Sequence, residues 1–173
     1  MNPIMTTRVL WAALMSSVGF FAVVILLLPP APMPANSIHL VAFGVAAASV
    51  AAVSFVVPRV VHASAAKTAS LAISEIPDPE APAGFGGARR VRVFTDPIAA
   101  RQQAFLLYSQ YTILGCALSE SVAIFGVVLN RMGHPPAVPL LFVLCGVILM
   151  ALRFPSEAKA LRLLEAATGA RLR

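Results

Sequence analysis

One carboxylate interrupts a long apolar stretch of this sequence, residues 113–129 (ILGCALSESVAIFGVVL). Glu120 lies between Ser119 and Ser121, and the stretch contains no Lys or Arg that could neutralise it. An ionisable side chain in the middle of a membrane helix costs roughly 2.5–3.5 kcal/mol and normally faces a bundle interior or a water pathway. A carboxyl group in such a place can take up and release a proton, or bind a cation.

Hydroxyl groups are the candidate partners of this carboxyl group. Ser121 follows Glu120 directly, and three other serines, Ser16, Ser17 and Ser49, fall at a similar depth in the other apolar stretches. A carboxyl group that has hydroxyl partners and no counter-charge is more stable neutral than ionised in apolar surroundings. We therefore predict a proton- or ion-binding site formed by Glu120 and these four serines, with Glu120 protonated when no ion is bound.

Other kinds of site find no support in the sequence. The three histidines lie near the ends of the apolar stretches, so none is expected to form a catalytic acid–base pair with Glu120. No CxxC, HExxH or His-rich cluster predicts a metal ion. Cys116 and Cys145 lie inside apolar stretches, where cysteine most often packs as a small apolar residue. We expect no enzyme activity, no metal ion, no other cofactor and no disulfide.

The composition is that of a membrane protein. Of the 173 residues, 59% are hydrophobic and 12% are charged, whereas soluble domains usually contain about 25% charged residues. The apolar residues are gathered in four blocks, at 9–28, 38–57, 104–129 and 138–152. A helix needs about 20 apolar residues to cross a bilayer, so the first three blocks are long enough. The fourth block reaches that length only if it is extended to residues 136–154. The first block exceeds the roughly 7–15 apolar residues of a cleaved signal peptide, so we expect it to be retained.

The first and third blocks resemble each other. Residues 13–25 (ALMSSVGFFAVVI) and 117–129 (ALSESVAIFGVVL) are identical at seven of thirteen aligned positions, and Ser16 takes the place of Glu120. Each stretch is followed by a short turn that contains proline and then by a second apolar block. This pattern predicts an internal repeat of two related helical hairpins.

We therefore predict an all-α integral membrane protein with four transmembrane helices as two related helical hairpins, plus a C-terminal amphipathic helix. The predicted segments are 1–62, the first hairpin; 63–103, a flexible cytoplasmic linker rich in Pro and Gly; 104–155, the second hairpin; and 156–173, a cytoplasmic amphipathic tail. Small residues allow membrane helices to pack closely, both within one chain and between subunits. The candidate helix-packing residues are Gly44, Ala48, Ala51, Gly115 and Gly126.

The basic residues predict the orientation. Twelve of the thirteen Lys and Arg residues lie before the first block, between the second and third, or after the fourth, and only Arg131 lies elsewhere. Because cytoplasmic flanks are enriched in basic residues, we expect both termini and residues 63–103 in the cytoplasm, with the protein in a bacterial inner membrane. The net charge of +6 follows from this topology, and no motif of interleaved aromatic and basic residues predicts binding to nucleic acid.

The third block is similar to part of a known family. Residues 113–129 resemble the carboxylate-bearing helix of subunit c of rotary ATP synthases, in which Gly-x-Ala-Leu-x-Glu precedes an Ile-aromatic-Gly-Val-Val run. Arg101 and Gln102 resemble the Arg-Gln of that family's cytoplasmic loop, although that loop is short and about forty residues intervene here. The resemblance covers about 30 residues. The matching positions in the helix are Gly115, Ala117, Leu118, Glu120, Ile124, Phe125, Gly126, Val127 and Val128.

Three functions are open at this point. The first is a non-catalytic subunit or assembly partner of a larger membrane complex, with Glu120 bonded to a partner helix. The second, which the resemblance implies, is binding or translocation of a proton or cation by Glu120, with Ser121 as an added ligand of the kind found in sodium-binding members. In the third, Glu120 is a protonated, serine-bonded core residue. The expected partners are the lipid bilayer, other membrane subunits or copies of the chain, and a proton or sodium ion.

Overall fold

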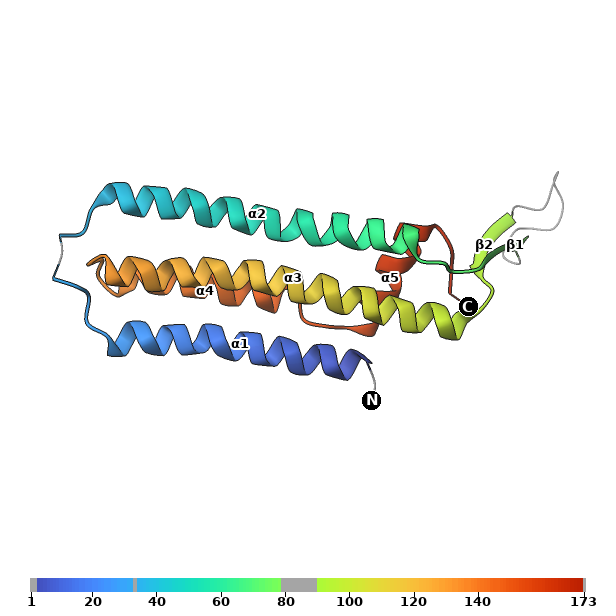
Figure 1. The fold of residues 1–173 in the computed structure, drawn as a ribbon, viewed down its shortest axis with the longest axis horizontal. Coiled ribbons are helices and arrows are strands. Elements are labelled where there is room, and N and C mark those ends of the chain that lie inside the picture. Colours follow the sequence, from blue (N-terminus) through green and yellow to red (C-terminus); the bar gives the residue numbers. More distant parts are fainter. Residues whose placement is uncertain (1–2, 33, 79–89, 173) are drawn as a thin grey trace.

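The chain folds into a bundle of long helices with a small sheet at one end (Figure 1). The computed structural model describes residues 3–32, 34–78 and 90–172. The prediction of a mainly helical protein is confirmed. Three of the helices, α1 to α3, are long and apolar enough to cross a membrane. Within the described ranges the elements are α1 (Pro3–Leu27), α2 (Ser37–Thr68), β1 (Ile73–Pro77), β2 (Arg90–Phe94), α3 (Pro97–Arg131), α4 (Ala137–Ala151) and α5 (Glu157–Thr168).

The fourth helix is shorter than predicted. α4 has 15 residues and is about 22 Å long at 1.5 Å per residue, less than the roughly 30 Å of a bilayer's hydrocarbon layer. It ends at Ala151, shortly before Pro155, as helices usually do ahead of a proline. By contrast, α2 has 32 residues and α3 has 35, about 48 and 52 Å, so both extend beyond such a layer. A fourth complete crossing is therefore not confirmed.

The central helix of the bundle is α3. α1 packs against α3 and α4, whereas α2 packs along another side of α3, so that α3 lies between α1 and α2 (Figure 1). α4 packs closely against α3. Two related hairpins are not confirmed by this arrangement, because α1 and α2 follow each other in sequence but each packs on α3. The internal repeat stays a prediction.

The two ends of the bundle differ. The start of α1, the sheet and α5 lie at one end, which we call the sheet end (Figure 1). The connections that follow α1 and α3 lie at the opposite end, which we call the turn end. The predicted topology requires this grouping, since it places the two termini and the segment between α2 and α3 on one side. Which side of the membrane that is stays a prediction.

The segment 63–103, predicted to be a flexible linker, contains regular structure on both sides of residues 79–89, which lie outside the described residues. α2 continues into the segment, and α3 begins inside it, where Asp96 accepts two hydrogen bonds from backbone N–H groups of the first turn. Between them β1 and β2 pair antiparallel, with Ile73 opposite Phe94. The alternating sequence RVRVF of β2 is typical of a strand, although the neighbouring prolines and glycines favour the interpretation as a linker.

The last helix, α5, is amphipathic and packs against α2 and α3 at the sheet end. It begins after Ser156, whose hydroxyl accepts a hydrogen bond from the backbone N–H of Lys159. Ala160 and Leu164 are buried against the bundle, whereas Lys159 and Arg162 are exposed. The helix therefore holds two cations close to the sheet end of the spans.

Candidate functional site

Glu120 lies half-buried on α3 and forms a hydrogen bond with a residue of α1. The hydroxyl of Ser17 on α1 donates a hydrogen bond to the Oε1 atom of Glu120 over 2.5 Å. Within the described residues, no cation forms an ion pair with Glu120. The helical rise over residues 120–131 places Glu120 about 16 Å from the turn end, a distance close to half of a roughly 30 Å hydrocarbon layer. The structure thus brings together the predicted carboxyl group and one predicted serine.

The hydroxyl of Ser17 has two neighbours but a single proton. Its Oγ atom is 2.8 Å from the backbone oxygen of Leu14 and 2.5 Å from Oε1 of Glu120. If Glu120 is ionised, Ser17 donates to it. If Glu120 is protonated, the carboxyl group can donate to Ser17, which then donates to Leu14. Both protonation states of Glu120 are therefore compatible with the same heavy-atom positions.

The other predicted serines hydrogen-bond to their own helices. Ser16 and Ser49 are exposed, and each donates to the backbone oxygen four residues earlier over 2.9 Å. Ser121 donates in the same way to Ala117 over 3.2 Å. Of the five predicted site residues, the structure brings together Glu120 and Ser17.

Arg153, which the charge pattern assigns to a cytoplasmic flank, is buried with only 5% of its surface exposed. Its Nη1 atom donates to Oγ of Ser119 over 2.6 Å and to the backbone oxygen of Leu149 over 2.8 Å. Its Nη2 atom donates to Oγ and to the backbone oxygen of Ser54, each over 2.8 Å. One guanidinium group therefore joins α2, α3 and α4 by hydrogen bonds. Its partner on α3, Ser119, directly precedes Glu120 in the sequence.

A glycine makes room for this guanidinium group. A Cβ atom at Gly115 would lie 2.6 Å from Nε and 2.8 Å from Cδ of Arg153. The ring of Phe55 covers another side, with its centroid 4.5 Å from Cζ of Arg153. No described carboxylate forms an ion pair with Arg153, and its Nε atom is buried without a hydrogen-bond partner among the described residues. Hydroxyls, carbonyls and an aromatic ring thus hold the charge. The sequence gives no signal for this, because an Arg after an apolar helix is normally a flanking residue.

The predicted helix-packing residues fall into two groups. Gly126, like Gly115, is closely packed inside the chain, because a Cβ atom there would lie 2.5 Å from the backbone oxygen of Pro139 on α4. A Cβ atom at Gly44 would instead meet no atom of the described residues within 4 Å. The second group lines an apolar groove of about 300 Å³ between α2 and α4: Gly44, Ala48 and Ala51.

The described residues offer little for metal binding. Within them, no group of three or more His, Cys, Asp or Glu side chains is placed to hold a metal ion. Cys116 is buried, Cys145 is exposed, and both are free thiols.

No protein-family model, curated protein or solved structure matches this chain. The resemblance of residues 113–129 to subunit c consequently rests on that one helix and stays a prediction. The features from which a function can be inferred are the Glu120–Ser17 pair, the buried Arg153 and the groove between α2 and α4.

Proposed function

We propose that the protein is a non-catalytic membrane subunit that binds a transmembrane helix of a partner protein in the groove between α2 and α4. The observation that carries this proposal is the open space beside Gly44. The proposal keeps the predicted location in a bacterial inner membrane, with both termini in the cytoplasm.

The helix α2 is poorly covered by the rest of the chain. In its most apolar window 11% of the residues are buried, compared with 44% in the central helix α3. α2 packs along α3 and makes almost no contact with α4. Lipid can cover an apolar helix face, so the preference for a partner helix comes from the residues that line the groove.

The α2 wall of the groove consists of small residues, namely Gly44, Ala47, Ala48 and Ala51. Transmembrane helices associate through such residues because their backbones can then approach closely. Glycine inside a helix costs about 1 kcal/mol relative to alanine. No packing contact among the described residues requires glycine at position 44. A partner helix that lies against Gly44 accounts for the glycine.

The α4 wall of the groove is formed by larger apolar side chains, including Leu141, Phe142 and Leu149. None of the described residues that line the groove is charged. The partner helix therefore needs an uncharged contact face, and van der Waals packing provides most of the affinity.

A free thiol in the groove allows a direct test. Cys145 is exposed and lines the groove, whereas Cys116 is buried. A photo-cross-linker attached to Cys145 in native membranes should give an adduct of defined mass. Gly44→Leu should reduce its yield at least about fivefold, because the larger side chain fills the groove. Gly19→Leu is the matched control, since Gly19 also has no atom within 4 Å of a Cβ position but lies on α1.

The mass of the adduct identifies the partner. A protein adduct of twice the chain mass identifies a second copy, a protein adduct of another mass identifies a different subunit, and an adduct with lipid alone contradicts the proposal. If Cys145 gives no adduct, or if Gly44→Leu and Gly19→Leu change its yield equally, the proposal is wrong.

The hydrogen bond between Ser17 and Glu120 favours a second candidate function, which is reversible proton binding inside the membrane. The shared hydroxyl of Ser17 accommodates both protonation states of Glu120. No described cation is paired with Glu120 to hold it ionised. Reactivity of Glu120 toward a carbodiimide tests this candidate independently of the groove.

A further inference from the structure

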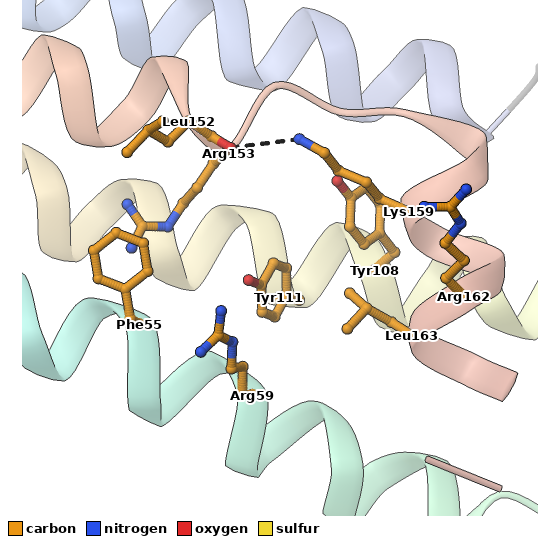
Figure 2. A pocket seen from close by; sticks show the side chains of 9 residues that line it. All are labelled: Phe55, Arg59, Tyr108, Tyr111, Leu152, Arg153, Lys159, Arg162 and Leu163. Carbon is orange, nitrogen blue, oxygen red and sulfur yellow. Dashed lines mark hydrogen bonds between the residues drawn. The ribbon is translucent and has the colours of Figure 1, made fainter. Parts of the chain in front are cut away.

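A cavity of about 330 Å³ lies toward the sheet end, between α2, α3 and the chain that runs from α4 into α5 (Figure 2). Four of the nine residues that line it are cations, and none is an acid. Arg59 lies on α2, Arg153 follows α4, and Lys159 and Arg162 lie on α5. The volume is within the range of ordinary ligand pockets.

Three of these cations have hydrogen-bond donors available. Arg59 and Arg162 are exposed and form no hydrogen bond or ion pair with a described residue. The Nζ atom of Lys159 reaches two backbone oxygens of the α4–α5 connection, each at 3.4 Å, which is long for a hydrogen bond. Both Nη atoms of Arg153 are already engaged, so this residue contributes a fixed positive charge. Cations gathered around one space without an acid favour an anionic ligand.

The cavity lies at the depth of lipid headgroups if the turn end marks the opposite membrane surface. At 1.5 Å per residue, residues 111–131 of α3 span about 30 Å and residues 37–59 of α2 span about 33 Å. The hydrocarbon layer is roughly 30 Å thick, so Tyr111 and Arg59 lie at its boundary. Tyr108 also lines the cavity, and tyrosine is enriched at this boundary.

The walls of the cavity differ in polarity. Figure 2 shows Phe55 and Leu152 on the side of Arg153, whereas Lys159 and Arg162 project from α5 on the other side. Leu152 is 60% exposed at the end of α4. A ligand with an anionic group next to an apolar chain matches both the cations and the apolar side chains of the cavity, whereas a free anion matches only the cations.

We propose that this cavity binds a phosphate group, which is held by Arg59, Lys159 and Arg162 while Arg153 adds to the positive potential. Guanidinium groups suit this ligand because their N–H donors can bond to two phosphate oxygens at once. The depth of the cavity and its apolar wall favour a phospholipid headgroup over free phosphate as the source. The inference does not depend on the groove between α2 and α4.

The test uses the full chain in an uncharged detergent and compares phosphatidylglycerol, phosphatidylcholine and inorganic phosphate. Native mass spectrometry counts bound lipid, and thermal unfolding reports binding of inorganic phosphate. Arg59→Gln/Lys159→Gln removes two cavity cations. Lys67→Gln/Arg101→Gln, the matched control, removes one Lys and one Arg at exposed positions that do not line the cavity. We expect phosphatidylglycerol to bind at least about tenfold more weakly to the cavity variant and less than about twofold more weakly to the control.

The outcomes separate the two sources of phosphate. Phosphatidylglycerol binding that only the cavity variant loses, and that inorganic phosphate does not displace, identifies a lipid ligand. Stabilisation by inorganic phosphate that only the cavity variant loses identifies a ligand that needs no acyl chain. The proposal is overturned if the wild-type chain binds neither probe, prefers phosphatidylcholine, or loses binding equally in both variants. If the cavity variant does not fold, Arg162→Gln is measured in its place, with the same outcomes.

Discussion

Ser119 and Glu120 are neighbours on α3, yet they connect it to different parts of the bundle. Ser119 accepts a hydrogen bond from Arg153, which is also bonded to α2, and Glu120 accepts one from Ser17 on α1. Successive residues of a helix differ in direction by about 100°, because one turn contains 3.6 residues. Two adjacent polar residues can therefore form hydrogen bonds on different sides of the central helix.

Carbodiimide, which modifies protonated carboxyl groups, should label Glu120 in intact membranes. The label should decrease as the pH rises, because the ionised carboxylate does not react. Glu120→Gln should fold and remain unlabelled, since Gln keeps the size of Glu and can accept the hydrogen bond from Ser17. Mass spectrometry of the labelled chain measures the effect. A wild-type chain that is unlabelled at every pH would rule out proton binding by Glu120.

Two adjacent serines provide a matched pair for the same experiment. Ser17→Ala should increase labelling of Glu120 at neutral pH, because an ionised Glu120 would lose the hydroxyl that donates to it. Ser16→Ala should leave the labelling unchanged, since Ser16 is exposed and bonds to its own helix. Equal effects of the two substitutions would show that the Ser17 contact has no part in the protonation of Glu120.

Removal of the buried guanidinium group should destabilise the bundle. Arg153→Ala deletes hydrogen bonds to three helices and leaves a cavity, so the free energy of unfolding should fall by at least about 2 kcal/mol. Arg101→Ala, at an exposed position of α3, should change it by less than about 0.5 kcal/mol. Unfolding in detergent measures both changes. A loss in Arg153→Ala no larger than that in Arg101→Ala would mean that Arg153 does not join the helices.

Gly115→Ala should disturb Arg153 through a single methyl group. The added Cβ atom would lie 2.6 Å from Nε of Arg153, so we expect a loss of roughly 1–3 kcal/mol of unfolding free energy. In the purified chain, Gly44→Ala should not destabilise the bundle, because no described atom lies within 4 Å of that position and alanine is the better helix former. The double variant Gly115→Ala/Arg153→Ala should lose less than the sum of the two single losses, because one contact accounts for both. Additive losses would place the cause elsewhere.

The orientation of the bundle can be tested by thiol labelling in sealed cells. With both native cysteines replaced, a cysteine at Met132, near the turn end, should react with an impermeant reagent added outside. A cysteine at the exposed position Ser70, at the sheet end, should react only after the membrane is opened. The predicted topology is wrong if Ser70→Cys reacts in sealed cells and Met132→Cys does not.

The helices could largely be predicted from the sequence, because apolar blocks, caps and prolines mark their extent. Their rotation could not be predicted, since α1 is apolar on most sides and no stripe fixes its direction. Ser16 and Ser17 are therefore equivalent candidates until packing against α3 selects Ser17. The burial of Arg153 could not be predicted from the sequence for another reason. It follows an apolar helix as flanking cations do, and only the early end of α4 leaves it among α2, α3 and α4.

The contacts of Arg153 also have an order in time, because the chain is synthesised from its N-terminus. α2 and α3 exist before residue 153 does, and the hydroxyls of Ser54 and Ser119 donate to backbone oxygens of their own helices, over 2.6 and 2.8 Å. Each helix can therefore enter the membrane with these hydroxyl protons already bonded. The oxygen atoms of the same hydroxyls remain free to accept bonds from the guanidinium group later. The hydrogen bonds of Arg153 can thus link α2, α3 and α4 only after all three helices have been synthesised.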